Sequence, residues 1–155
     1  MTFENQDPGS RKVGVNERRR AREDALKLIF EASVQNPEDA DAFFRGEAEH
    51  LDLKNDIAYV KTVFDGVLAH KDEIDSLIGD FSRGWKTGRI PRAVLSAMRI
   101  CVYEMLFYFG DSGEKIAFNI SINEAINLVK KYGEGKDPSF ANGVLNGIAE
   151  KRGLK

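Results

Sequence analysis

Cysteine is almost absent from this chain, which has Cys101 as its single cysteine among 155 residues. An internal disulfide is therefore excluded, and so is a zinc site built on paired cysteines. The two histidines, His50 and His70, stand beside no serine or cysteine motif, and no glycine loop has the spacing of a phosphate-binding P-loop. The sequence thus predicts a protein that is not an enzyme and that needs no metal or cofactor.

Long apolar runs are missing as well, and none could span the hydrocarbon core of a bilayer. The first residues lack the apolar stretch of a secretory signal, and they carry too few arginines and too many acids for a transit peptide. We therefore expect a cytoplasmic protein without a membrane segment.

The overall composition is that of a globular protein, with 42% hydrophobic residues, 31% charged residues and a formal net charge of -2. A chain of this length can bury a substantial core as one domain. Residues 1–15 are polar, contain Pro8 and several glycines, and show no periodicity, which predicts a disordered tail. The remaining residues, 16–155, are expected to form the folded domain.

Apolar residues recur at helical spacing through most of the chain, and no segment alternates convincingly as a strand does. Seven helices are expected, over about 16–36, 38–47, 53–69, 74–81, 91–109, 121–132 and from 137 toward the C-terminus. Short connections favour antiparallel neighbours, so the predicted class is all-α, a compact bundle that consists of two packed subbundles.

Capping residues support several of these boundaries. Asn16 has the side chain of an N-cap, and Ser121 with Glu124 has the form of a capping box. Asp137 is a suitable cap for the last helix, with Pro138 at the first helical position.

The helix expected at 91–109 is apolar around most of its circumference, which is typical of a central helix. A narrow polar stripe remains, made of Arg92, Ser96, Arg99 and Tyr103. Two interpretations stay open for this stripe: it is the side of the helix that meets water, or it anchors a protein interface.

Four arginines, Arg18, Arg19, Arg20 and Arg22, fall in the first turns of the first helix, where the helix dipole disfavours cations. Residues 11–22 hold six basic side chains and one acid, a local charge of +5. Arg18 and Arg22 continue the apolar stripe of the helix, so this end should project beyond the core. Such a surface suits phosphates, although a run of charge is often only a solvated surface.

Lys130 and Lys131 could extend this basic surface if the last loop lies beside the first helix. They could equally complement the negative end of their own helix. Phe140 offers a ring for base stacking, but a single aromatic residue in a helix is more often part of the core.

Four blocks in register make the chain resemble the NusB family of transcription antitermination factors. They are Arg18–Glu23 with Ala25 and Leu28, Trp85 with Arg89 and Ile90, Arg99 with Tyr103 and Glu104, and the segments Ile122–Ala125, Lys130–Gly133 and Phe140–Leu145. The resemblance extends from residue 16 to the C-terminus and leaves out the N-terminal tail.

This resemblance implies an all-helical protein of two subbundles that binds single-stranded boxA RNA together with the ribosomal protein NusE and joins RNA polymerase complexes. The RNA-binding residues that it implies, together with the two lysines, are Arg18, Arg19, Arg20, Arg22, Lys130, Lys131, Phe140 and Asn142. The partner-binding residues that it implies are Arg99, Tyr103 and Glu104, to which we add Arg92 as a member of the same polar stripe. Val94 stands where the family usually has an acid, and Ala141 and Asn146 replace a valine and an aspartate.

Two other functions remain open. The chain could be a protein-interaction scaffold or a homodimer whose arginines serve a protein partner, because some relatives are thought to dimerise through the basic surface. It could also be a fragment of an rRNA methyltransferase, since NusB-like domains occur fused to such enzymes, but no cofactor-binding segment is found in the sequence.

Overall fold

The computed structural model describes residues 13–82 and 87–155, and within these ranges it contains helices and no strand. Most of the predicted tail, residues 1–12, lies outside the described residues, as does Trp85. The helices are α1 (Val15–Gln35), α2 (Ala40–Leu51), α3 (Ile57–Ala69), α4 (Lys71–Phe81), the short 3-10 helix η3 (Thr87–Arg89), α5 (Arg92–Leu106), α6 (Phe118–Tyr132) and α7 (Asp137–Lys151). The predicted all-α class is confirmed.

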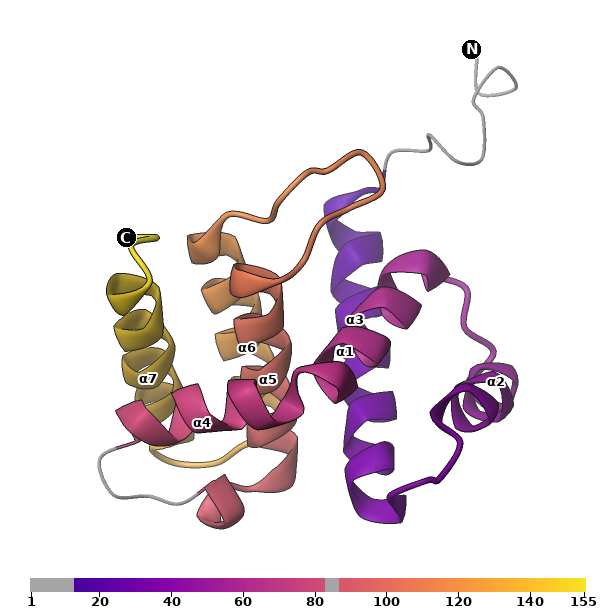
Figure 1. Ribbon diagram of the computed structural model, residues 1–155, viewed down its shortest axis with the longest axis horizontal. Helices are drawn as coiled ribbons and strands as arrows, with labels where there is room; N and C mark the ends of the chain where they lie inside the picture. The colour runs from indigo at the N-terminus through magenta and orange to yellow at the C-terminus, as the bar shows by residue number, and fades with distance from the viewer. Residues whose placement is uncertain (1–12, 83–86) are drawn as a thin grey trace.

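The helices form two groups that meet at α5 (Figure 1). On one side α1 packs against α2 and α3, and on the other α5, α6 and α7 pack side by side while α4 crosses them. Because α5 contacts α1, α3, α4, α6 and α7, it joins the groups into one body. This arrangement agrees with the predicted pair of subbundles.

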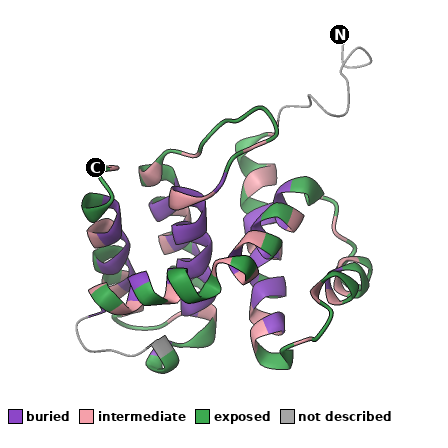
Figure 2. Cartoon of the chain, in the orientation of Figure 1, coloured by how far each residue is buried: buried purple, intermediate pink, exposed green. Residues whose placement is uncertain are grey.

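The central helix α5 is more deeply buried than its sequence pattern indicates, since 12 of its 15 residues are buried (Figure 2). The prediction of an exposed polar stripe is wrong for Ser96, Arg99 and Tyr103, because α3 and α4 cover that side of the helix. Arg92, at the start of α5, is the member of the stripe that remains exposed.

Several predicted caps are also wrong. The helix α1 begins at Val15 after Gly14, without a side-chain cap, so Asn16 lies inside the helix. The helix α6 begins at Phe118, three residues before Ser121, so Ser121 and Glu124 form no capping box. In α7, Asp137 is the first residue, and its carboxylate accepts a hydrogen bond from the backbone N–H of Glu134.

Among the described residues, we find no helix that is long and apolar enough to cross a membrane.

Candidate nucleic-acid interface

The arginines of α1 divide into an inner and an outer pair. Arg22, of the inner pair, is 3% exposed. Its Nε donates a hydrogen bond of 2.8 Å to Oε2 of Glu104, and its Nη2 donates one of 3.3 Å to Oε1. Glu104 is fully buried on α5, and it also accepts hydrogen bonds from Ser121 Oγ at 2.7 Å and from the hydroxyl of Tyr59. Four helices, α1, α3, α5 and α6, therefore meet at one carboxylate.

An ion pair between Arg22 and Glu104 lies at the centre of this buried network. Burial alone lowers the pKa of Arg22, but the interactions with Tyr59 and with the hydrogen-bonded Glu104 outweigh burial, and the pKa lies above its ordinary value. Burial and the charge of Glu104 raise the pKa of Tyr59, so its hydroxyl stays protonated and donates. The network thus consists of a guanidinium, a carboxylate and a neutral phenol, with every buried polar side-chain atom of the described residues satisfied.

Arg18, the other inner arginine, attaches the start of α1 to α3. Its Nε donates a hydrogen bond of 2.9 Å to Oδ2 of Asp56, and its guanidinium lies 4.4 Å from the centre of the Tyr59 ring. Glu17 accepts a hydrogen bond of 2.9 Å from the backbone N–H of Asp56. The predicted overhang is therefore wrong: Arg18 and Arg22 do continue the apolar stripe, but they bind Asp56, the N-cap of α3, and Glu104 of α5.

The outer arginines, Arg19 and Arg20, face solvent. The side chain of Arg19 is 54% exposed, and its Nε donates hydrogen bonds of 2.8 and 3.0 Å to the carboxylate of Glu124 on α6. Arg20 is exposed and makes no hydrogen bond or ion pair with the part of the chain that the structure describes. The guanidinium of Arg20 is thus accessible, and a ligand could bind it without breaking a contact to any described residue.

A groove of about 560 Å³ runs beside Arg19 between α1, α6 and the start of α7. The residues that line it are Val15, Arg19, Ile120, Asn123, Glu124, Ile126, Asn127, Lys130 and Asn142. A smaller hollow next to it is lined by Arg19, Glu23, Asn127 and Lys131, among others. The structure therefore brings Arg19, Lys130, Lys131 and Asn142, separated by up to 123 positions in sequence, to one surface. We call this the α1–α6 face.

Sequence reasoning missed the two asparagines of α6 that line the groove, Asn123 and Asn127. They are spaced by four, in phase with Lys130 and Lys131, so the exposed side of this helix carries amides followed by ammonium groups. This spacing was visible in the sequence and could have identified them. Amide side chains can donate and accept hydrogen bonds with base edges.

Two acids moderate the positive charge of the α1–α6 face. Glu124 binds Arg19, and Glu23 binds Nζ of Lys131 at 2.6 Å and accepts a hydrogen bond from the hydroxyl of Tyr132. Desolvation raises the pKa of Glu23, but the hydrogen bonds from Lys131 and Tyr132 outweigh it and lower the pKa below its usual value. Desolvation and Glu23 together raise the pKa of Tyr132 to about 12.

Phe140 does not line this groove. It is half-buried and packs against the hydrophobic core, while Asn142, two residues later, is exposed beside Lys130. Asn146 donates its amide to the backbone carbonyl and the side-chain oxygen of Asn142, at 2.9 and 3.1 Å, which orients the Asn142 side chain.

The residues predicted to bind a protein partner do not share one exposed face. Arg92 is exposed, whereas Arg99 and Tyr103 are 6% and 7% exposed and Glu104 is fully buried in the network with Arg22. Val94, where an acid was expected from the resemblance, is itself fully buried in the core. The structure leaves Arg92 as the member of this set that a partner can reach directly.

No group of histidines, cysteines and acids that could hold a metal ion occurs among the described residues. His70 stacks on Phe107 with ring centres 4.0 Å apart, and His50 is exposed. Cys101 is buried, and burial raises the pKa of its thiol well above the ordinary value.

Comparisons with known proteins agree on one family. A model of the NusB family matches residues 19–150 of the chain. The transcription antitermination protein NusB of Acetivibrio thermocellus is 36% identical over 134 residues, which cover 86% of this chain and 88% of that protein.

Solved structures extend this similarity to the fold. A structure of the antitermination factors NusB and NusE in complex with double-stranded RNA has a chain that is 27% identical, with a TM-score of 0.73, over 89% of this chain and 99% of that chain. A structure of NusB from T. maritima is 26% identical, with a TM-score of 0.74, over 86% of this chain and 91% of that one.

Proposed function

The chain belongs to the NusB family, whose matching members are transcription antitermination proteins and not enzymes. We therefore propose that it binds the boxA element of nascent RNA together with the ribosomal protein NusE. The RNA lies on the α1–α6 face, and the pair joins the RNA polymerase antitermination complex in the cytoplasm. A solved complex of a similar NusB with NusE and double-stranded RNA supports both partners.

The observation that carries this proposal is the convergence of Arg19, Lys130 and Lys131 on a surface with a groove, with the exposed Arg20 next to Arg19 in α1. Phosphate contacts supply most of the affinity in nucleic-acid binding, and guanidinium and ammonium groups are the side chains that make them. The neighbouring amides of Asn123, Asn127 and Asn142 can bind base edges. Phosphates are therefore held by the rim of the groove, and bases are read within it.

The inner arginines support this face without touching RNA. Arg22 and Arg18 fix α1 against α5 and α3 through a buried and a half-buried ion pair. The backbone that carries Arg19 and Arg20 is therefore held in place. We therefore assign Arg18 and Arg22 a positioning role and assign the phosphate contacts to Arg19 and Arg20. Phe140 belongs to the same supporting group, since it packs against the core.

Affinity for RNA alone should be modest. Glu23 and Glu124 already bind Lys131 and Arg19, so RNA must share or displace these ion pairs. NusE supplies the remaining affinity, and Arg92 is the residue through which we expect the partner to be contacted.

A titration with four RNAs tests the proposal: boxA and a scrambled sequence, each as single strand and duplex, with and without NusE. We expect boxA to bind more tightly than the scrambled RNA and NusE to strengthen that preference. The logarithm of the affinity should fall with the logarithm of salt concentration by about 0.7 for each phosphate neutralised on a single strand. Equal binding of boxA and scrambled RNA in the presence of NusE would refute the proposal.

A homodimer that covers the same face is the second candidate, because exposed apolar side chains border the groove. Val15 is 69% exposed and Ile120 is 52% exposed. Light scattering with and without boxA RNA separates the two functions, since RNA should dissociate a dimer that uses this face.

A further inference from the structure

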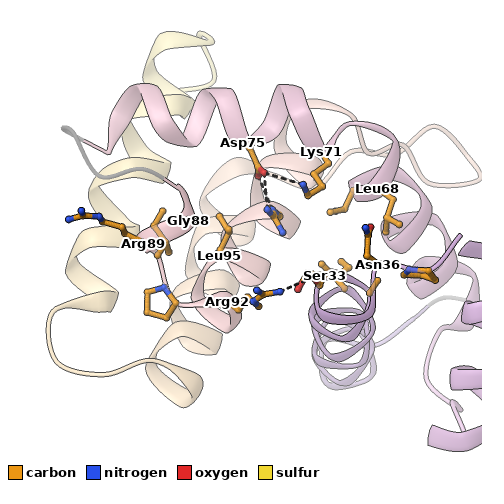
Figure 3. Close-up of a pocket in the computed structure, with 16 residues that line it drawn as sticks. Ser33, Asn36, Leu68, Lys71, Asp75, Gly88, Arg89, Arg92 and Leu95 are labelled. Atoms are coloured by element: carbon orange, nitrogen blue, oxygen red, sulfur yellow. Dashed lines mark hydrogen bonds and ion pairs between the residues drawn. The ribbon is translucent and has the colours of Figure 1, made fainter.

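A second cleft, of about 750 Å³, opens near the other end of α1 (Figure 3). The C-terminal half of α1, the junction of α3 and α4, and the segment from η3 into α5 form its walls. Apolar side chains that include Ile29, Leu68 and Leu95 line it, together with four cationic side chains and a single acid, Asp75. The cleft combines an apolar surface with an excess of positive charge.

Two of the cations share the acid. Arg99 donates two hydrogen bonds of 2.8 Å to the carboxylate of Asp75, and Lys71 lies 3.9 Å from the same carboxylate (Figure 3). Arg99 is buried, and the carboxylate of Asp75 balances its charge. Lys71 is exposed, and its acidic partner, Asp75, is 3.9 Å away and already binds Arg99.

The other two cations have no acidic partner in the described structure. Nη1 of Arg92 donates a hydrogen bond of 2.7 Å to the backbone carbonyl of Ser33, a neutral acceptor near the end of α1. Arg89 is exposed at the edge of the cleft, with its guanidinium directed away from Asp75, and makes no hydrogen bond or ion pair with the described residues (Figure 3). The apolar lining of the cleft is therefore surrounded by positive charge that no acid among the described residues balances.

We propose that this cleft binds an acidic segment of a protein partner, with carboxylates against Arg92 and Lys71 and an apolar side chain against Leu68 and Leu95. Charge complementarity selects an acidic ligand. The apolar lining selects a peptide over RNA, because none of the described residues that line the cleft is aromatic and could stack a base. The inference rests on the proposed function for the existence of a protein partner, but not for the location or chemistry of this site.

The test uses the full chain with isotope-labelled leucine and isoleucine methyl groups. The probe is a short synthetic peptide in which a leucine is flanked by glutamates, and the control peptide has glutamine at each glutamate. We expect the acidic peptide to shift the methyl resonances of Leu68 and Leu95, and the glutamine peptide to bind at least about tenfold more weakly.

Two variants locate the binding. Arg92→Glu should weaken the acidic peptide about tenfold or more, and Arg89→Glu, which removes no contact within the described structure, should weaken it by a smaller factor. Arg45→Glu, with the same charge change on the exposed side of α2, is the matched control and should bind as the unaltered chain does. Equal shifts with both peptides, or no shift with either, would overturn the inference.

RNA is titrated into the same sample. The methyl group of Ile120 reports on the α1–α6 face, and those of Leu68 and Leu95 report on the cleft. If boxA RNA shifts Ile120 while the acidic peptide shifts nothing, only the cleft proposal fails. If the peptide binds while RNA leaves Ile120 unchanged, the proposed RNA function fails. RNA that shifts Leu68 and Leu95 would make the cleft a nucleic-acid site and contradict the peptide.

Discussion

Arg19 and Arg22 lie within one turn of the same helix and are chemically identical, yet one is 54% exposed on its side chain and the other 4%. Their positions on the helix explain the difference. Arg18 and Arg22 fall on the side that packs against α3 and α5, where they bind Asp56 at the N-cap of α3 and Glu104 on α5. Arg19 and Arg20 fall on the outer side and meet solvent. Four arginines that are neighbours in sequence thus form two pairs with different roles, because the helix turns them toward different sides.

The two pairs also differ in what their interactions contribute. A buried ion pair whose remaining polar atoms are satisfied is costly to break, because the surviving charge is left without water or partner. An exposed ion pair such as that of Arg19 with Glu124 contributes about 0 to 1 kcal/mol. The inner pair should therefore control stability, and the outer pair should control RNA affinity.

The largest effect is expected from breaking the buried network. Arg22→Met leaves Glu104 charged and buried, and should lower the free energy of unfolding by about 3 to 5 kcal/mol. Urea unfolding measures this value. Arg45→Met, at an exposed position of α2, is the matched control and should change stability by no more than about 0.5 kcal/mol.

The double variant Arg22→Met with Glu104→Gln sharpens this result. Because the second change removes the unpaired carboxylate charge, the double variant should be more stable than Arg22→Met alone. A loss below about 1 kcal/mol in Arg22→Met would mean that the network does not hold α1 in place.

The second prediction concerns the outer pair. Replacing both Arg19 and Arg20 by alanine should reduce the slope of log affinity against log salt by about 1.4, as two phosphate contacts of about 0.7 each are lost. Stability should fall by less than about 1 kcal/mol, because one of the two makes an exposed ion pair and the other makes none. The matched control is Arg45→Ala, and an unchanged salt slope would remove Arg19 and Arg20 from the interface.

A smaller gain in RNA binding is expected from Glu23→Gln. This change removes the carboxylate that binds Lys131 and leaves its ammonium group available for phosphate. Affinity for boxA RNA should rise by a factor of about two to five, which corresponds to the 0.4 to 1 kcal/mol typical of an exposed ion pair. Glu47→Gln on α2 serves as the control for a general change in charge, and weaker binding by Glu23→Gln would contradict this arrangement.

The smallest effect is the pH dependence of the same contact. The pKa of Glu23 is lowered from the usual 4.5 by Lys131 and Tyr132, against an opposing effect of desolvation. The stabilisation is therefore present above pH 4.5 and is lost as the pH falls through the lowered pKa of the folded state. An NMR titration of the Glu23 carboxyl should show its pKa rise in Lys131→Ala; no change would mean that the ion pair does not form in solution.

Local sequence pattern predicted the existence and class of the helices well, because each helix buries a stripe of apolar residues at the spacing of its turns. Their ends were less predictable. Ser121 and Glu124 have the spacing of a capping box, but in the structure their side chains bind Glu104 and Arg19 on other helices. Tertiary contacts thus use the two side chains that the capping-box rule assigns to the helix end.

The candidate site shows the same limit. The basic segment was visible in the sequence, but its division into inner and outer arginines depends on Asp56 and Glu104, which lie 38 and 82 positions away from their partners. The buried state of Arg99 depends in the same way on Asp75 of α4. Charged residues that the sequence pattern predicts to be exposed can be buried when they form an ion pair with an acid distant in sequence. A single sequence does not show which residues form such pairs.

The division of the arginines is tested most directly by the side-chain Nε–H resonances of Arg18, Arg19, Arg20 and Arg22 during a titration with boxA RNA and NusE. The predicted result is a shift for Arg19 and Arg20 and none for Arg18 and Arg22, whose donors stay bound to Asp56 and Glu104. Shifts of the inner pair, or no shift of the outer pair, would contradict the account.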